Sequence, residues 1–147
     1  MSRLRVAAGV AAVLLVAAYL HDPPWAGRIT SGLLDWEDDA SGTIYRWTLG
    51  RASFFVPGDA TAMTLPMRAV FPGPNGAPVT VRVSVDGRWL ADVTLDHPDE
   101  WVRPVLPLPA KSTGRRFRRV DLHVSRTAVG DDILGVQTGQ IALDRAP

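Results

Sequence analysis

Tryptophan is the residue type in this chain best suited to binding a ligand. The sequence of 147 residues contains five tryptophans, and an indole ring can pack against the C–H face of a sugar as it packs against other apolar groups. Trp101 opens a predicted strand, so we expect it and Trp36 to be the exposed pair. Trp47 alternates with Tyr45 and should share its face of a strand. An ordinary core or sheet-face position remains the alternative for each of Trp36, Trp47, Trp89 and Trp101.

Charged residues close to Trp36 supply the polar half of such a site. Glu37 can accept and Arg46 can donate the hydrogen bonds that fix the orientation of sugar hydroxyl groups. The acidic run 37–39 can equally be a solvated loop before a strand. The candidate carbohydrate-binding residues are therefore Trp36, Glu37, Arg46 and Trp101.

Metal and catalytic sites are not predicted. Calcium prefers several loop oxygens, which Asp38, Asp39, Asp131 and Asp132 could supply, but neither acidic run has a recognised calcium-loop spacing. Cysteine is absent, which excludes thiol catalysis, disulfides and zinc-thiolate sites. The three histidines lack metal-ligand spacing, and the sequence has no nucleophile elbow, phosphate loop or dinucleotide fingerprint. We expect no catalytic residue, no metal and no cofactor.

The charge balance is nearly neutral. Sixteen basic and fifteen acidic residues give a net charge of +1, which argues against a nucleic-acid surface. One dense basic cluster, 115–119, stands out. It can meet anionic lipid headgroups or a polyanion, or it can be the charged guard of a strand edge.

The N-terminus predicts a membrane segment. Two arginines precede an uncharged run from Val6 to Leu20, and Pro23 and Pro24 end it. About fifteen helical residues cover about 22 Å, against roughly 30 Å of hydrocarbon. Residues 1–20 are therefore predicted to be a signal anchor or a cleaved signal peptide, with membrane contact over 4–20. The leading arginines favour a cytoplasmic N-terminus and an extracytoplasmic domain, and Trp25 is an expected interfacial anchor.

Beyond Thr43 the apolar residues alternate with period two. Valine occupies every odd position in 79–85, Asp86-Gly87 follows as a hairpin turn, and 88–95 returns as the partner strand. Further strands are predicted at 43–48, 52–56, 63–71, 101–108, 119–125 and 140–143. Proline at 66, 104, 107 and 109 marks strand ends or edges. Seven or eight short strands favour a sandwich or jelly roll.

The order of several short motifs resembles a known kind of domain. Gly-Leu-Leu-Asp-Trp-Glu at 32–37, Tyr-Arg-Trp-Thr at 45–48, Leu-Pro-Met-Arg at 65–68, Val-Asp-Gly at 85–87, Trp101 and Leu-Gly-Val at 134–136 follow one another. Together they resemble the bacterial carbohydrate-binding-module-like jelly-roll domains appended to membrane glycosyltransferases and cell-envelope proteins. The resemblance covers about 32–143. One departure is that Asp132 and Ile133 stand where the family carries an arginine, which removes a possible partner of Glu37.

These observations predict an all-β, jelly-roll-like two-sheet sandwich preceded by one N-terminal hydrophobic helix. The expected segments are the leader at 1–20, a linker at 21–30 and the sandwich at 31–147. The resemblance implies a non-catalytic, membrane-anchored bacterial cell-envelope module that binds carbohydrate, either a glycan or a lipid-linked sugar. The alternative is a docking or structural domain whose partner is an envelope membrane protein. Exposed tryptophans beside polar groups in a groove would favour the first, and a flat apolar patch the second.

Overall fold

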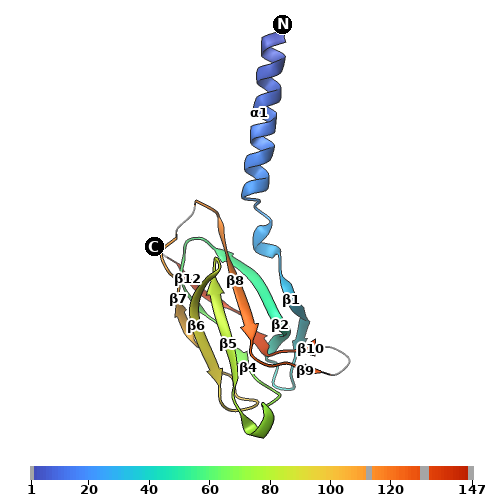
Figure 1. The fold of residues 1–147 in the computed structure, drawn as a ribbon, viewed down its shortest axis with the longest axis vertical. Coiled ribbons are helices and arrows are strands. Elements are labelled where there is room, and N and C mark those ends of the chain that lie inside the picture. The colour runs from blue at the N-terminus through green and yellow to red at the C-terminus, as the bar shows by residue number, and fades with distance from the viewer. Residues whose placement is uncertain (1, 112–113, 130–132, 146–147) are drawn as a thin grey trace.

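The computed structural model describes residues 2–111, 114–129 and 133–145 and shows a β-domain joined to one long helix (Figure 1). The helix is α1 (Ser2–His21), and a short helical turn, η1 (Ala26–Arg28), follows it. The strands are β1 (Ser31–Asp38), β2 (Ile44–Pro57), β3 (Ala60–Thr64), β4 (Met67–Arg68), β5 (Val79–Val85), β6 (Arg88–Leu95), β7 (Val105–Pro107), β8 (Phe117–Val124), β9 (Ala128–Val129), β10 (Ile133–Leu134), β11 (Gln137–Gly139) and β12 (Ala142–Arg145), with a second short turn, η2 (Pro74–Gly76), before β5.

The strands form two main sheets. The larger sheet has the order β4-β11-β2-β8-β5-β6, and β1 pairs with β2. The second sheet has the order β12-β3-β7, and β9 with β10 forms a separate small hairpin. Most neighbours are distant in sequence, as jelly-roll connections require. The predicted all-β, two-sheet sandwich with one N-terminal helix is confirmed.

The core lies between the sheets. Alternation places Val81 and Val83 of β5 and Leu122 of β8 inward, and Met63 of β3 comes from the opposite sheet. Leu65, which follows β3, is also fully buried. Burial of these apolar side chains supplies the main driving force for folding.

The β5–β6 hairpin is confirmed in detail. Val79 pairs with Leu95 and Val85 with Arg88. Asp86 and Gly87 both have positive φ, 51° and 76°, the backbone conformation for which this dipeptide is favoured in a tight hairpin turn.

One strand was missed, and several predicted strands have other boundaries in the structure. The strand expected at 101–108 is confined to β7, and the strand expected at 140–143 is β12, which begins at Ala142. The segment at 31–38 forms β1, which the apolar pattern did not identify as a strand. The strands expected at 43–48 and 52–56 are one strand, β2, because Gly50 and Arg51 continue the extended backbone. The strand expected at 63–71 is divided between β3 and β4, because Pro66 cannot donate a ladder hydrogen bond.

Helix α1 stands clear of the sandwich. Its 20 residues span about 30 Å at 1.5 Å per residue, and its described side chains are exposed on all sides. Among the residues that the structure describes, α1 is the one helix that is long enough and apolar enough to cross a membrane.

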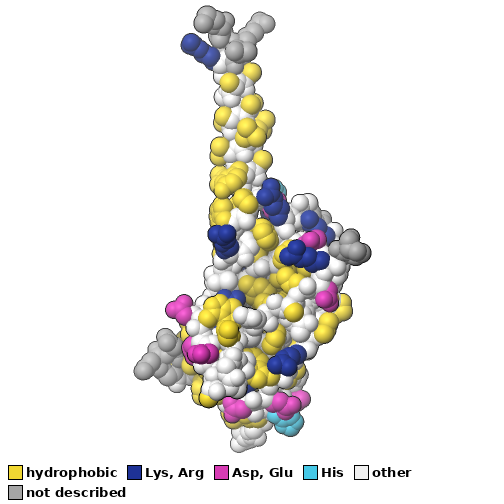
Figure 2. Space-filling model, turned by 180° about the vertical axis from the view of Figure 1, so that it is seen from behind, with side chains coloured by type: hydrophobic (Ala, Val, Ile, Leu, Met, Phe, Trp, Pro, Cys, Tyr) yellow, Lys and Arg dark blue, Asp and Glu magenta, His cyan; other side chains and the backbone are white. Residues whose placement is uncertain are grey.

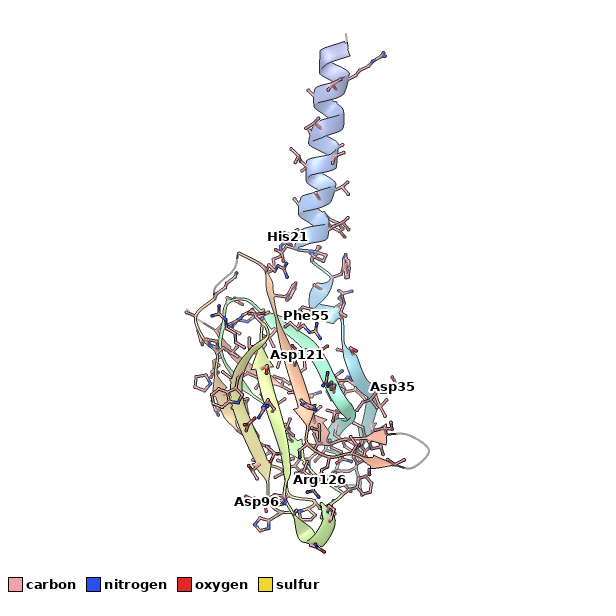
Figure 3. The ribbon with its side chains drawn as sticks, in the orientation of Figure 1. His21, Asp35, Phe55, Asp96, Asp121 and Arg126 are labelled. Carbon is pink, nitrogen blue, oxygen red and sulfur yellow. The ribbon has the colours of Figure 1, made fainter. Side chains whose placement is uncertain are left out.

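The domain has two distinct ends relative to α1. His21 lies at the base of the helix, whereas Asp96 and Arg126 lie at the opposite end of the sandwich (Figure 3). Strand β1 leaves the linker and runs away from the helix (Figure 1). The hairpin turn after β1 therefore lies toward the end distant from the helix.

Candidate functional site

The β1–β2 hairpin carries three of the four predicted binding residues. Trp36 pairs with Arg46, and Glu37 pairs with Tyr45. Cross-strand partners share a face of the sheet and successive residues alternate between faces. Trp36 and Arg46 therefore lie on one face of the hairpin, and Glu37 and Tyr45 lie on the other.

Trp36 and Arg46 contact each other directly. The Arg46 guanidinium carbon lies 4.6 Å from the centroid of the Trp36 ring, a cation–π geometry. The Trp36 side chain is 49% exposed. Burial lowers the pKa of Arg46, and its Nε atom is buried with no hydrogen-bond partner among the described residues. This pair offers an indole face with a partly desolvated cation behind it.

Glu37 holds a second aromatic group. The Tyr45 hydroxyl donates to Glu37 Oε2 at 3.0 Å. Burial, and then the hydrogen bond to Glu37, raise the pKa of Tyr45. Trp47 lies edge-on to Tyr45, as the alternation predicted, with centroids 6.4 Å apart, and it stacks on Phe71 at 5.7 Å. This face is an aromatic layer fixed at one end by a carboxylate.

Arg68 of β4 links this layer to the fourth predicted residue, Trp101. Its guanidinium carbon lies 5.7 Å from the Tyr45 ring centroid and 4.8 Å from that of Trp101. Its Nε donates to Gln137 Oε1 at 2.8 Å, and Nη2 lies 3.7 Å from Asp39 Oδ2. These contacts hold Arg68 as a wedge between the two rings and fix the orientation of Trp101.

Trp101 also lines a pocket of about 330 Å³ at the strand ends, whose other lining residues are Gly42, Thr43, Ile44, Pro66, Arg103, Gly139 and Gln140. The indole Nε1 of Trp101 is buried and has no hydrogen-bond partner among the described residues. The remaining predicted residues, Trp36, Glu37 and Arg46, lie on the neighbouring hairpin outside this lining. An aromatic face beside a guanidinium, a hydroxyl and an amide can receive a polar ligand that has an apolar face.

Sequence reasoning missed Arg68, Arg103, Thr43 and Gln140. They come from four separate segments of the chain, and no spacing in the sequence connects them with Trp101. The sequence also predicted that Trp36 and Trp101 are the exposed tryptophans of the domain. Trp36 is exposed, but Trp101 is half-buried and Trp89 is 65% exposed. The Arg68 guanidinium, which packs against the Trp101 ring, accounts for part of that burial.

A second pocket, of about 280 Å³, lies on the outer face of β2 and β8. Its polar groups come from Arg51, Ser53, Arg119, Asp121 and His123. Its described lining includes no tryptophan, tyrosine or phenylalanine, and Arg119 is paired with Asp121 at 2.8 Å. It therefore lacks an aromatic stacking surface.

Asp39 has a structural role in the hairpin turn. Its Oδ1 accepts hydrogen bonds from the backbone N–H groups of Ser41 and Thr43, at 2.9 and 3.0 Å, and from the Ser41 hydroxyl. No group of three or more acidic or histidine side chains able to hold a metal occurs among the described residues. Asp131 and Asp132, the candidate calcium ligands besides Asp38 and Asp39, lie outside the described residues.

Asp39 is expected to titrate below its ordinary pKa of 3.8, because the Ser41 hydroxyl and then the Thr43 N–H hydrogen-bond its charged form. A depressed pKa means that the carboxylate stabilises the turn above 3.8 and that this contribution is lost as the pH falls through the lowered value. Carboxyl carbon NMR of the full chain should show this, and Ser41→Ala should raise the pKa toward 3.8. A midpoint at or above 3.8 in the unsubstituted chain would contradict the turn geometry.

Comparisons with known proteins give distant structural likenesses. No family model matches the chain, and no curated protein matches it. A family 35 carbohydrate binding module from Clostridium thermocellum aligns at 12% identity over 80% of this chain and 92% of its own, with a TM-score of 0.48. The C-terminal domain of EclA, a sugar-binding protein, aligns at 12% identity over 75% and 90%, with a TM-score of 0.47.

A longer enzyme shows a similar likeness to part of its chain. A family 115 4-O-methyl-α-glucuronidase with specificity for decorated arabinogalactans aligns at 11% identity over 81% of this chain, with a TM-score of 0.48. This chain spans only 18% of that enzyme's length. Carbohydrate-binding modules are thus among the structures that this sandwich resembles, as the motif order suggested, but likenesses this distant do not assign a ligand or a residue role.

Proposed function

We propose that this protein is a non-catalytic module that binds a glycan chain in the Trp101 pocket and that α1 carries it on a cell-envelope membrane. The observation that carries the proposal is the pocket itself, which is lined by Trp101 together with Arg103, Thr43 and Gln140. A sugar ring has an apolar C–H face and a rim of hydroxyl groups. The indole matches the face, and the three polar side chains match the rim.

The four residues predicted from sequence take different roles in this proposal. Trp101 stacks on the bound sugar. Ile44 lines the pocket on the same strand and face as Arg46, so a longer glycan extends past Ile44 onto the exposed Trp36–Arg46 pair. Glu37 acts indirectly, because it holds Tyr45 against the Arg68 wedge.

The position of the pocket bears on which class of glycan it binds. It lies beyond the far end of β1, whose eight residues span about 25 Å. If α1 crosses a membrane, the pocket faces away from that membrane. This placement favours a polysaccharide of the envelope or the surroundings over a sugar linked to a lipid of the same bilayer.

Binding can be tested with the full chain in phosphatidylcholine nanodiscs. Titration with envelope and plant-type oligosaccharides should give a saturable change in tryptophan fluorescence for at least one series, with affinity rising with chain length up to the span from Trp101 to Trp36. The absence of any saturable change from a folded chain would contradict glycan binding.

The second candidate function is docking on an envelope membrane protein. The β9–β10 hairpin favours it, because Val129 is 83% exposed and Ile133 is also exposed, and the hairpin projects from the sandwich in Figure 1. Exposed apolar side chains on a protruding element are typical of protein contacts. If no glycan binds, this hairpin is the surface to test next, by cross-linking from an introduced cysteine at position 129.

A further inference from the structure

The linker is bound to the domain. The backbone N–H of Arg116 donates to Asp22 Oδ1 at 2.9 Å, and Arg116 Nε lies 3.5 Å from Asp22 Oδ2. Gly27 lies against the Phe117 ring so closely that a Cβ there would be 2.5 Å from a ring carbon. These contacts fix the base of α1 beside the segment that leads into β8.

The arginines of the basic cluster 115–119 lie in three different surroundings. Arg118 is only 3% exposed, because it turns inward, pairs with Asp86 at 3.0 Å and donates to the Pro109 carbonyl. Arg119 pairs with Asp121 on the outer sheet face. Arg115 and Arg116 remain at the base of the helix, and Arg116 is held by Asp22.

A pocket of about 420 Å³ opens between the helix base and this segment, lined by His21, Asp22, Gly114 and Arg115. Arg28 and Lys111 add exposed positive charge at the same end of the domain. A Cβ on Gly58 would lie 2.9 Å from Lys111 Nζ and 2.8 Å from the Arg115 carbonyl oxygen, so Lys111 lies beside this segment. Asp59, the residue after Gly58, is an exposed carboxylate beside this segment. Figure 2 shows Lys and Arg side chains gathered around the base of the helix.

This geometry fits a lipid phosphate. Helix α1 spans about 30 Å including the arginines at its start, so with these arginines at one interface its last residue lies at the headgroup level of the other. Trp25, whose side chain is exposed, stands at the depth where tryptophan is enriched in membrane proteins. A guanidinium recognises phosphate oxygens strongly, and positive charge at this depth attracts anionic headgroups.

We propose that the surface formed by Arg28, Lys111, Arg115 and the pocket beside His21 docks on the phosphate groups of anionic lipids. Docking presses this end of the sandwich onto the bilayer and holds the opposite end, with the Trp101 pocket, pointing outward. The proposal rests on the membrane insertion of α1 that the proposed function includes, and it does not depend on which glycan is bound.

The experiment uses the full chain in nanodiscs of phosphatidylcholine and in nanodiscs of equal parts phosphatidylcholine and phosphatidylglycerol. Because the chain has no cysteine, Ala110→Cys can carry a single environment-sensitive NBD fluorophore near this surface. Its emission should move to shorter wavelength only in the anionic nanodiscs, and added salt should reverse the shift because screening weakens the contact. Arg115→Glu should abolish the shift.

The charge-matched control is Arg126→Glu, since Arg126 is exposed at the opposite end of the domain (Figure 3), and this variant should keep the full shift. Equal emission in both kinds of nanodisc, or a shift that survives Arg115→Glu, would overturn the proposal. The same shift produced by inorganic phosphate in phosphatidylcholine nanodiscs would assign the surface to a free anion instead. A chain that does not co-elute with any nanodisc would refute membrane insertion itself, which is a separate failure.

Discussion

Trp101→Ala is expected to weaken glycan binding by about thirty-fold, or about 2 kcal/mol. The substitution removes the indole from the pocket lining, while Arg103, Thr43 and Gln140 remain in place. Isothermal titration of the full chain in nanodiscs with the tightest-binding oligosaccharide measures the change. Trp101→Phe should recover part of the affinity, because a smaller ring keeps a stacking surface.

Trp89→Ala is the matched control for this prediction. Trp89 is more exposed than Trp101, 65% against a half-buried ring, and it lies on β6 outside the pocket lining. Its removal should leave the affinity unchanged. Because Trp101 also contacts the Arg68 guanidinium, the urea midpoint of each variant must be compared. An unchanged affinity in a folded Trp101→Ala variant would show that the pocket is not the binding site.

Leu122→Ala is expected to lower the free energy of unfolding by about 3 kcal/mol. This is the usual cost of truncating a buried leucine to alanine, which leaves a cavity. Leu122 is 1% exposed and sits in β8 between Ala52 of β2 and Val83 of β5. Urea unfolding of the chain in nanodiscs, followed by circular dichroism in the β region, measures the loss.

His123→Ala provides the comparison, because the next residue of the same strand faces outward and is exposed. Its effect should stay within about 0.5 kcal/mol. If His123→Ala destabilised the fold more than Leu122→Ala, β8 would be shifted by one residue, since a one-residue slip exchanges the two faces of a strand.

Much of the fold could be predicted because its signals are local. The alternating valines of 79–85 and the Asp86-Gly87 turn predict both faces and the partner strand of that hairpin. Strand β1 was not recognised, because its burial comes from lying against β2 and its own residues do not alternate. The domain boundaries at 20 and 30 stay predictions, although α1 ends at His21 and β1 begins at Ser31.

Local sequence patterns predicted only part of the candidate site. Alternation within one strand predicted that Tyr45 and Trp47 share a face, and the structure confirms it. Only strand pairing placed Glu37 beside Tyr45 and Trp36 beside Arg46, on opposite faces. The binding role of these residues and of Trp101 remains a prediction.

The sequence by itself determined the apolar helix, the all-β class and the absence of thiol chemistry. The length of an apolar run, the period of apolar residues and the composition are properties of the chain that do not depend on contacts between distant segments. The tertiary structure decided which side chains meet. Arg68 reaches Trp101 and Gln137 from β4 only after the sheets have formed. Arg118 is buried within a run of arginines because its position in β8 turns the side chain inward, where it pairs with Asp86 and donates to the Pro109 carbonyl. Contacts between residues far apart in sequence depend on the register of non-adjacent strands, which no local pattern records.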